Sequence, residues 1–138
     1  MEMEREERNR RVIEEFRANA GKVGGPFEGR PMILITATGA RSGRRRTTPL
    51  VYLREGERVL VVGSKGGAPT HPDWYHNMVA NPAVIVELGR ETYEAAAQVI
   101  TGPEHDRLYA KLVEQMPFFG DYQAKTTRII PVIELVRR

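Results

Sequence analysis

The sequence predicts an α+β fold, a small and mainly antiparallel β-barrel of about six strands with an N-terminal helix and short connecting helices. The first observation is a series of short runs rich in β-branched residues, separated by glycine and proline turns. The second is that helical periodicity is confined to the start of the chain and to brief segments between these runs. At 138 residues, the chain is long enough for a substantial core.

The first 25 residues are expected to form a charged helix and a linker, and residues 26–138 are expected to form the barrel domain. Within a helix over residues 3–19, Val12, Ile13 and Phe16 form a narrow apolar stripe among arginines and glutamates. We expect this stripe to pack on the barrel or on another subunit, which leaves a homodimer open. The polar face carries nearly as much acid as base, which argues against binding to anionic lipid.

The barrel strands follow from runs of apolar residues that end at turn residues. They are predicted at residues 31–37, 48–54, 58–63, 83–88, 91–101 and 128–136. The first three form an antiparallel meander, because Glu55-Gly56-Glu57 makes a tight turn. Three shorter segments have the apolar spacing or the terminal residues of helices or turns. The first begins at Pro72 or Asp73 and ends at about residue 79. The other two span residues 103–115 and 120–127.

An arginine-rich connection joins the first two strands, within the stretch Thr36–Tyr52. From Arg30 to Arg54 there are six arginines and no acidic residue. Glycine backbone N–H groups, hydroxyls and guanidinium groups all favour anionic oxygen atoms. The connection therefore predicts a pocket for phosphate or carboxylate, with a solvated basic loop as the alternative.

Three sequence blocks carry a family resemblance: GARSGRRRTTPLVY from residue 39, GSKGGAPTHPDWYHNMVANP from residue 63 and PFFGDYQAKTTRIIPVIEL from residue 117. In this order and spacing they resemble the deazaflavin-dependent nitroreductase family, over roughly residues 31–135. The resemblance implies a split β-barrel in which residues 26–138 bind coenzyme F-420, an 8-hydroxy-5-deazaflavin. It also implies an oxidoreductase that passes hydride to a small-molecule electron acceptor, a quinone, an enone or a nitroaromatic compound.

The resemblance assigns two residues to the chemistry, Ser64 and Tyr122. Ser64 is expected to hydrogen-bond near the reactive ring, and Tyr122, Ser64 or water would supply a proton. Phosphate and tail contacts are expected from Arg41, Ser42, Arg46, Thr47 and Thr48. The remaining expected cofactor-binding residues are Ala40, Pro49, Leu50, Val51, Val62, Gly63, Ser64, Lys65, Asp73, Trp74, Tyr75, His76, Asn77 and Phe119.

The aromatic segment near the C-terminus departs from the family pattern. Phe118, Phe119 and Tyr122 would cover the ring face, or would otherwise form a satellite of the core. Family members that reduce nitro compounds and quinones carry tyrosines across this patch, whereas here Met116 and Phe119 stand at two of those positions and only Tyr122 keeps the hydroxyl. This difference puts nitroimidazole reduction in doubt and leaves cofactor binding unaffected.

Composition excludes several classes of function. The chain has no cysteine, which removes disulfides, thiol catalysis and cysteine metal sites. His71, His76 and His105 lack the spacing of a metal site, so no metal is expected. A charged start and the absence of a long apolar run predict a cytoplasmic protein without stable membrane insertion, at most peripheral to the membrane.

Two other functions remain open from the sequence. The first is a split-barrel oxidoreductase that uses FMN, which would share the fold and the basic loop. The second is a non-catalytic binding module, such as a cofactor or haem carrier. A nucleic-acid binder is not expected, because the net charge is only +3 and the arginines are not interleaved with aromatic residues.

Overall fold

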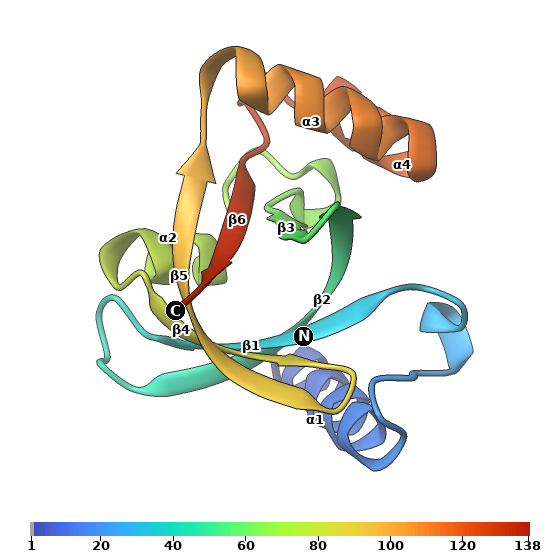
Figure 1. Ribbon diagram of the computed structural model, residues 1–138, viewed down its shortest axis with the longest axis vertical. Coiled ribbons are helices and arrows are strands. Elements are labelled where there is room, and N and C mark those ends of the chain that lie inside the picture. Colours follow the sequence, from blue (N-terminus) through green and yellow to red (C-terminus); the bar gives the residue numbers. More distant parts are fainter. Residues whose placement is uncertain (1) are drawn as a thin grey trace.

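Six antiparallel strands close into a barrel in the order β1-β2-β3-β6-β5-β4 (Figure 1). The computed structural model describes residues 2–138. The strands are β1 Met32–Thr38, β2 Arg45–Glu55, β3 Arg58–Val62, β4 Ala83–Leu88, β5 Glu91–Ile100 and β6 Val132–Arg137. The helices are α1 Glu2–Ala18, α2 Asp73–Ala80, α3 Gly102–Gln115 and α4 Phe118–Ala124, with 3-10 turns η1 Gly25–Phe27 and η2 Lys65–Gly67. The predicted α+β barrel and its initial three-stranded meander are confirmed.

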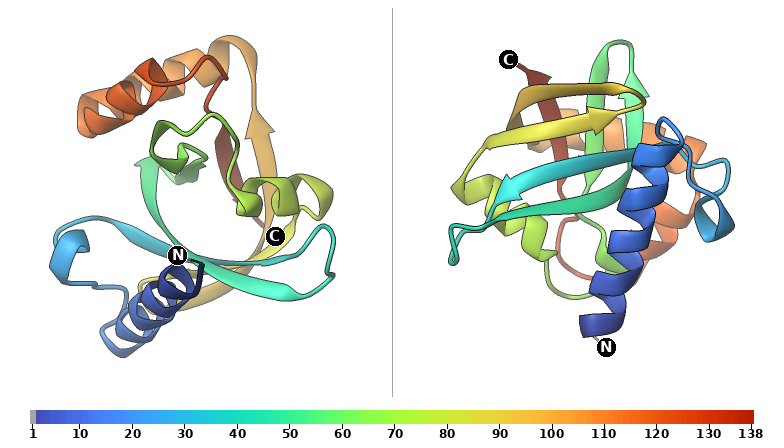
Figure 2. Two further views of the ribbon diagram at one scale, coloured as in Figure 1. Left: turned by 180° about the vertical axis from the view of Figure 1, so that it is seen from behind. Right: turned by 90° about the horizontal axis from the view of Figure 1, so that it is seen from below.

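Strand β1 is buried on both faces, because each face has a different cover. Ile33, Ile35 and Ala37 point into the barrel, where they pack with residues of the other strands. The alternate residues Met32 and Leu34 point outward and pack with the apolar stripe of α1, as period-two alternation requires. The helix therefore lies against the β1–β2 side of the barrel, and its apolar stripe is the reason (Figure 2).

The remaining helices cover the ends and the other outer face. Met78 and the partly buried Trp74 of α2 join the barrel interior, so α2 fills the space between β1 and β5. Leu60 points outward from β3 and packs with Leu108 and Leu112 of α3. Figure 1 shows α3 and α4 side by side beyond one end of the barrel.

Two strand boundaries differ from the prediction by more than one residue. Strand β2 begins at Arg45 instead of residue 48, because its ladder with β1 continues to the pair Thr38 and Arg45. The connection between the two strands is correspondingly short. It is closed by a hydrogen bond from the Gly39 N–H to the Arg44 carbonyl oxygen at 2.8 Å.

The last strand, β6, begins at Val132 instead of residue 128. Before β6, backbone hydrogen-bonding groups pair with a side chain instead of a neighbouring strand. The Gln123 side chain accepts a hydrogen bond from the Ile130 N–H and donates one to the Arg128 carbonyl oxygen. Helix α4 also begins and ends earlier than the predicted segment 120–127. Within residues 2–138, no helix has both the length and the apolar character needed to cross a membrane.

Candidate cofactor and acceptor cleft

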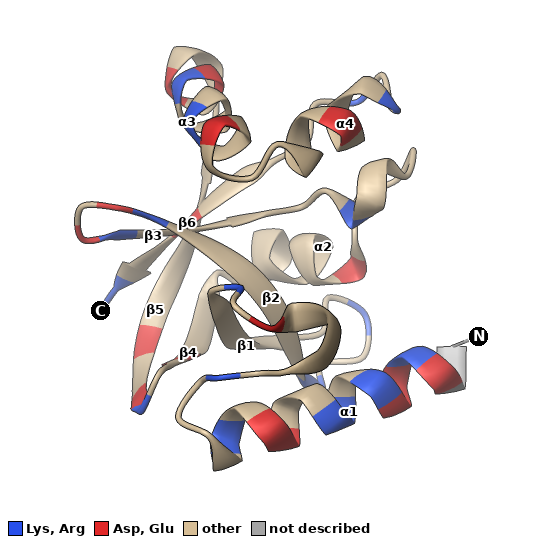
Figure 3. Cartoon of the chain, turned by 90° about the vertical axis from the view of Figure 1, so that its right-hand side faces the viewer, with Lys and Arg blue, Asp and Glu red and all other residues tan. Residues whose placement is uncertain are grey.

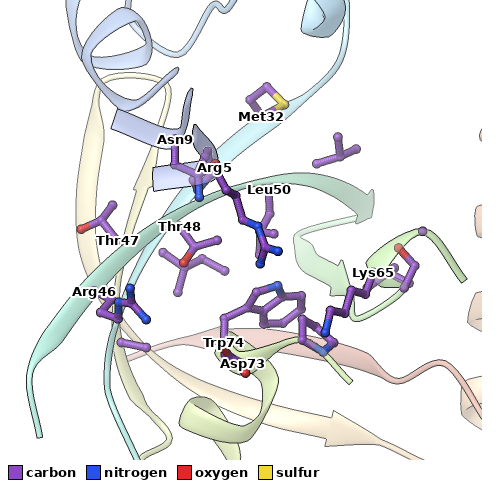
Figure 4. Close-up of a pocket in the computed structure, with 18 of the residues that line it drawn as sticks. Arg5, Asn9, Met32, Arg46, Thr47, Thr48, Leu50, Lys65, Asp73 and Trp74 are labelled. Atoms are coloured by element: carbon purple, nitrogen blue, oxygen red, sulfur yellow. The ribbon is translucent and has the colours of Figure 1, made fainter. Parts of the chain in front are cut away.

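A cleft with a volume of about 620 Å³ lies between α1, residues 46–51 of β2, η2, α2 and α4. Figure 4 shows 18 of its lining residues, which come from segments far apart in the sequence. Pockets of this size accommodate a cofactor ring or a drug-sized ligand. The cleft is therefore the leading candidate for a functional site.

The floor of the cleft is apolar. It is formed by Ile35 and Ala37 of β1, Leu50 of β2, Met78 of α2 and the indole of Trp74. Ile35, Ala37 and Met78 belong to the packed barrel interior and are themselves buried. A planar ring system would find apolar contact here, with its polar substituents directed toward the rim.

Cationic side chains surround this floor. Five cations line the cleft against two acids, Glu6 and Asp73; the cations are Arg5, Arg10, Arg30, Arg46 and Lys65. In Figure 4 the Arg5 guanidinium extends from α1 toward Trp74, and the Lys65 side chain extends from the η2 side toward the same space. This excess of positive charge fits a ligand with anionic groups, because guanidinium and ammonium groups form charge-assisted hydrogen bonds with them.

Helix α1 forms one wall of the cleft, which the sequence did not predict. Arg5, Asn9 and Ile13 follow one another at four-residue spacing, so they lie on one face of the helix. That spacing was a usable signal, although it does not reveal what the face contacts. Positive and negative residues are interspersed along the helix, as Figure 3 shows.

Glu6 of α1 pairs with Arg46 of β2 at 3.2 Å across the cleft. Both side chains are more than half exposed, at 59% and 57%. An exposed pair of this kind contributes about 0–1 kcal/mol, so an anionic ligand could displace Glu6 at little cost. The contact ties the helix to the same arginine that the sequence assigned to an anion.

The turn after β3 supplies the polar wall. Ser64 is buried at 9% exposure and lines the cleft, and Lys65 Nζ donates to the Thr70 Oγ1 at 3.2 Å. Lys65 has a φ of 47°, which is in the left-handed region that non-glycine residues rarely adopt. Uncommon backbone geometry of this type is frequent at ligand sites.

Helix α4 brings an aromatic cluster to the cleft. The rings of Phe119 and Tyr122 meet edge to face at 5.8 Å, and Phe118 lies 4.5 Å from Phe119 between ring centroids. Tyr109 of α3 holds this segment, because its hydroxyl donates to the Phe119 carbonyl oxygen at 2.6 Å. Burial raises the pKa of Tyr109 to about 12, so the hydroxyl remains a donor at neutral pH.

The structure brings most of the predicted site residues together at the cleft. Those that line it are Arg46, Thr47, Thr48, Pro49, Leu50, Val51, Val62, Ser64, Lys65, Asp73, Trp74, Asn77, Phe119 and Tyr122. The lining also contains residues that the sequence analysis did not assign to the site. Those are Arg5, Glu6, Asn9, Arg10, Ile13, Phe27, Arg30, Met32, Ile35, Ala37, Gly66, Pro72 and Met78, and the expected aromatic contact Phe118 also lines the cleft.

Six predicted residues lie outside the lining. Ala40, Arg41 and Ser42 are exposed on the β1–β2 connection, where the Ala40 N–H donates to Asn77 Oδ1 at 2.9 Å. Tyr75 and His76 instead pack against the His71 ring, with centroid separations of 4.7 and 5.7 Å. Gly63 is buried under Pro131, which a Cβ at that position would approach to 2.8 Å.

Comparison with known proteins identifies the family of this chain. Residues 8–136 match the model of a family described as F420H(2)-dependent quinone reductase. An F420H(2)-dependent quinone reductase of Mycobacterium tuberculosis is 38% identical over 129 residues, which cover 89% of this chain and 85% of the relative.

Two solved structures are also similar to this chain over most of its length. An F420-H2 dependent reductase superposes with a TM-score of 0.70 at 41% identity, over 77% of this chain and 94% of that one. A domain-swapped dimer superposes with a TM-score of 0.71 at 36% identity, over 94% of this chain and 95% of the other. The match spans nearly the whole barrel and α1, and the resemblance seen in the sequence is confirmed. The chain belongs to the F420H(2)-dependent quinone reductase family.

Proposed function

We propose that the cleft binds coenzyme F-420 and a quinone together, and that the chain acts there as a quinone reductase. The observation that carries the proposal is the combination of an apolar floor with five cationic side chains at the rim. A deazaflavin has a planar ring and an anionic tail, so the donor set and the shape of the cleft both fit it. When bound, the reduced coenzyme supplies a hydride, and the quinone needs that hydride and one proton to become a hydroquinone.

The ring is assigned to the inner part of the cleft. Pro49, Leu50 and Val51 on one side and Trp74 on the other would enclose it, with Ser64 at its edge. The barrel interior holds this floor rigid, because Leu50 and Trp74 pack against fully buried residues. A rigid floor excludes water and fixes the ring relative to the acceptor.

The anionic tail is assigned to the rim. Arg46 and Lys65 lie on opposite walls of the cleft, and Thr47 and Thr48 offer hydroxyl donors beside Arg46. Arg41 and Ser42, on the exposed connection outside the cleft, would meet the distal part of a long tail. A fork-shaped guanidinium suits phosphate, and lysine supplies a mobile point charge.

The quinone is assigned to the space beneath α4. Phe118 and Phe119 offer ring faces for stacking, and Tyr122 adds a hydroxyl that can donate to a quinone oxygen. Such a donor stabilises the charge that develops on oxygen during reduction, and it contributes more in the transition state than in the ground state. Tyr122 is therefore our candidate proton donor, with Ser64 as a supporting hydrogen-bonding group.

A homodimer is proposed as the assembly. One solved relative is a domain-swapped dimer, and α1 is joined to the barrel by a linker long enough to carry the 3-10 turn η1. Sedimentation velocity over a hundredfold range of protein concentration would measure the assembly. A single species with the mass of one chain at every concentration would contradict it.

The activity itself is tested with reduced coenzyme F-420 and a soluble menaquinone analogue, mixed anaerobically with the purified protein. We expect the coenzyme to be oxidised and hydroquinone to form in equal amounts. NADPH with FMN, in place of the deazaflavin, is the control and should support no turnover. Tight cofactor binding with no quinone reduced would indicate a carrier and would overturn the proposed function.

A further inference from the structure

Arg128, in the segment before β6, holds the polar wall of the cleft from behind. Its guanidinium donates to three backbone carbonyl oxygens: from Nε to Ala68 at 2.9 Å, from Nη1 to Gly63 at 3.1 Å and from Nη2 to Ser64 at 2.8 Å. These carbonyls bracket the turn that carries Lys65. Arg128 does not line the cleft, so its influence on a ligand is indirect.

The turn held by Arg128 has a backbone that needs external support. Lys65 is left-handed at a φ of 47°, and Gly66 and Gly67 follow at 64° and 85°. A Cβ at Gly67 would lie 2.7 Å from the Tyr122 carbonyl oxygen, so α4 packs directly on the turn. Left-handed non-glycine residues persist only where their surroundings fix them, and here the surroundings are α4 and Arg128.

The imidazole ring of His71 also contacts the guanidinium of Arg128. Its Nδ1 lies 2.9 Å from Arg128 Nη1, and because a guanidinium only donates, Nδ1 must be an unprotonated acceptor. Burial, together with the charges of Arg128 and His76, lowers the pKa of His71 below its ordinary 6.5. Within the part of the chain that the structure describes, the groups in contact with the ring are Arg128 and, from α2, Tyr75 and His76, and none of them is a carboxylate that would favour the protonated form.

We propose that Arg128 is a positioning residue that fixes Ser64 and Lys65 for ligand binding, and that protonation of His71 releases it, so that the cleft loses affinity on acidification. This inference rests on the proposed function, because it names the cofactor as the ligand. Protonated His71 cannot accept from Arg128 and would place a second cation beside it. The carbonyl contacts of the guanidinium would then be strained or lost, and the turn would be free to leave its left-handed geometry.

The direct test is a fluorescence titration with oxidised coenzyme F-420 at pH values from 8 to 5, on the parent protein and on three variants. His71→Asn keeps an acceptor near the position of Nδ1 and does not titrate, and His76→Asn is the matched control. Arg128→Lys keeps the charge but loses the fork, and it should weaken binding at pH 7.5 by about 10-fold. The Kd of the parent divided by that of His71→Asn, taken at each pH, cancels any titration of the ligand itself.

We expect this ratio to rise with acidity, by up to about tenfold for each pH unit below the His71 pKa. In the His76→Asn control the same ratio to His71→Asn should also rise, starting at a somewhat higher pH, because His76 no longer lowers the pKa of His71. A flat ratio in the parent would overturn the inference. If Arg128→Lys does not fold, the His71→Asn comparison still decides, because that variant leaves Arg128 in place.

Hydrogen exchange separates failure of this inference from failure of the proposed function. The amides of Gly67 and Ala68 donate to the carbonyls of Ser64 and Lys65, at 2.9 and 3.1 Å, and report whether the turn is closed. In the free parent, their protection factors should fall on acidification, and in His71→Asn they should stay constant. Unchanged protection in the parent would overturn the inference even if the coenzyme binds. A parent that binds no coenzyme F-420 but shows this loss of protection would instead reject the proposed function alone.

Discussion

At the scale of single residues, the cleft places side chains of similar chemistry in very different environments. Arg46 and Lys65 are largely exposed at the rim, whereas Arg128 is half-buried and fully engaged with backbone oxygens. The exposed cations Arg46 and Lys65 can exchange bound water for a ligand. Arg128 is already hydrogen-bonded to the turn after β3, so it keeps the polar wall of the cleft in place. Substitutions should therefore separate the residues that bind ligand from those that support the site.

Replacement of Arg46 by alanine should weaken coenzyme F-420 binding by about 10- to 100-fold, since a charge-assisted hydrogen bond contributes about 1.5–3 kcal/mol. Arg45 precedes it on β2 without lining the cleft, so Arg45→Ala is the matched control. The loss should be smaller for a cofactor fragment without phosphate and glutamates. Equal binding of whole cofactor and fragment by Arg46→Ala and the parent would remove this arginine from the site.

Tyr122→Phe should lower kcat for a quinone acceptor while the affinity for the cofactor stays nearly constant. Loss of a donor to a developing oxyanion costs about 2.7–4 kcal/mol in a dry site, and a partly exposed cleft should show about a 10-fold effect. Tyr75→Phe is the control, because Tyr75 lies outside the cleft lining. An unchanged kcat in Tyr122→Phe would leave water as the proton source.

At the scale of elements, α1 links the wall of the cleft to the outer face of the barrel. Phe16 is buried with Met32 and Leu34, while Glu6 and Asn9 reach the cleft. The helix is fixed at its C-terminal half by apolar packing, and its N-terminal half contacts β2 through the exposed ion pair of Glu6 with Arg46. The N-terminal half is therefore the part that a ligand can move.

Glu6→Gln should strengthen coenzyme F-420 binding by about 2- to 5-fold, because it frees Arg46 from an exposed ion pair worth about 0.2–1 kcal/mol. Glu57, in the exposed turn between β2 and β3, does not line the cleft, so Glu57→Gln tests for a general charge effect. Isothermal titration of both variants at low salt measures the difference. Equal gains in the two variants would show that only net charge matters.

The elements differ in how far the sequence could predict them. Strands β1 and β3 follow from continuous apolar runs, whose alternate residues fill the barrel on one side and meet a helix on the other. The start of β2 could not be predicted, since Arg45, Arg46 and Thr47 have no apolar pattern and are held by the ladder with β1. A ladder partner is a tertiary contact, and it overrides local propensity.

Prediction of the site from the sequence is limited in the same way, because some of its contacts are tertiary. The resemblance identified most of the cleft from β2, η2 and α4, because those residues occur in three continuous blocks. The contact of Arg128 with His71 spans 57 positions and has no local signal. The placement of α1 over the cleft likewise depends on how one narrow stripe packs, which spacing alone does not specify.

At the scale of the whole molecule, buried polar contacts as well as apolar packing join α3 to the segment before β6 and to α4. His105 Nε2 lies 2.7 Å from the Ile130 carbonyl oxygen, and the Tyr109 hydroxyl binds the Phe119 carbonyl oxygen. Buried hydrogen bonds are costly to break when one partner is left unsatisfied. They hold α4 over the cleft in one position.

Tyr109→Phe should lower the free energy of unfolding by about 1–3 kcal/mol at pH 7, because the buried Phe119 carbonyl loses its donor. The pKa of Tyr109 is about 12 in the folded protein, above its ordinary 10.0, so the unfolded chain releases this proton first. Stability of the parent should therefore fall as pH rises from 10 toward 12, by more than that of Tyr109→Phe. Urea unfolding at pH 7 and pH 11 measures both effects, and an identical alkaline loss in the two proteins would contradict the account.

The central claim is that this cleft selects a deazaflavin with an anionic tail over an ordinary flavin. A competitive titration measures it directly, with coenzyme F-420 and FMN offered to the same purified protein at equal concentration. We expect coenzyme F-420 to bind more tightly than FMN. In Arg46→Ala, the ratio of the two affinities should decrease, because the variant binds the anionic tail more weakly. Equal or tighter binding of FMN by the parent protein would contradict the claim.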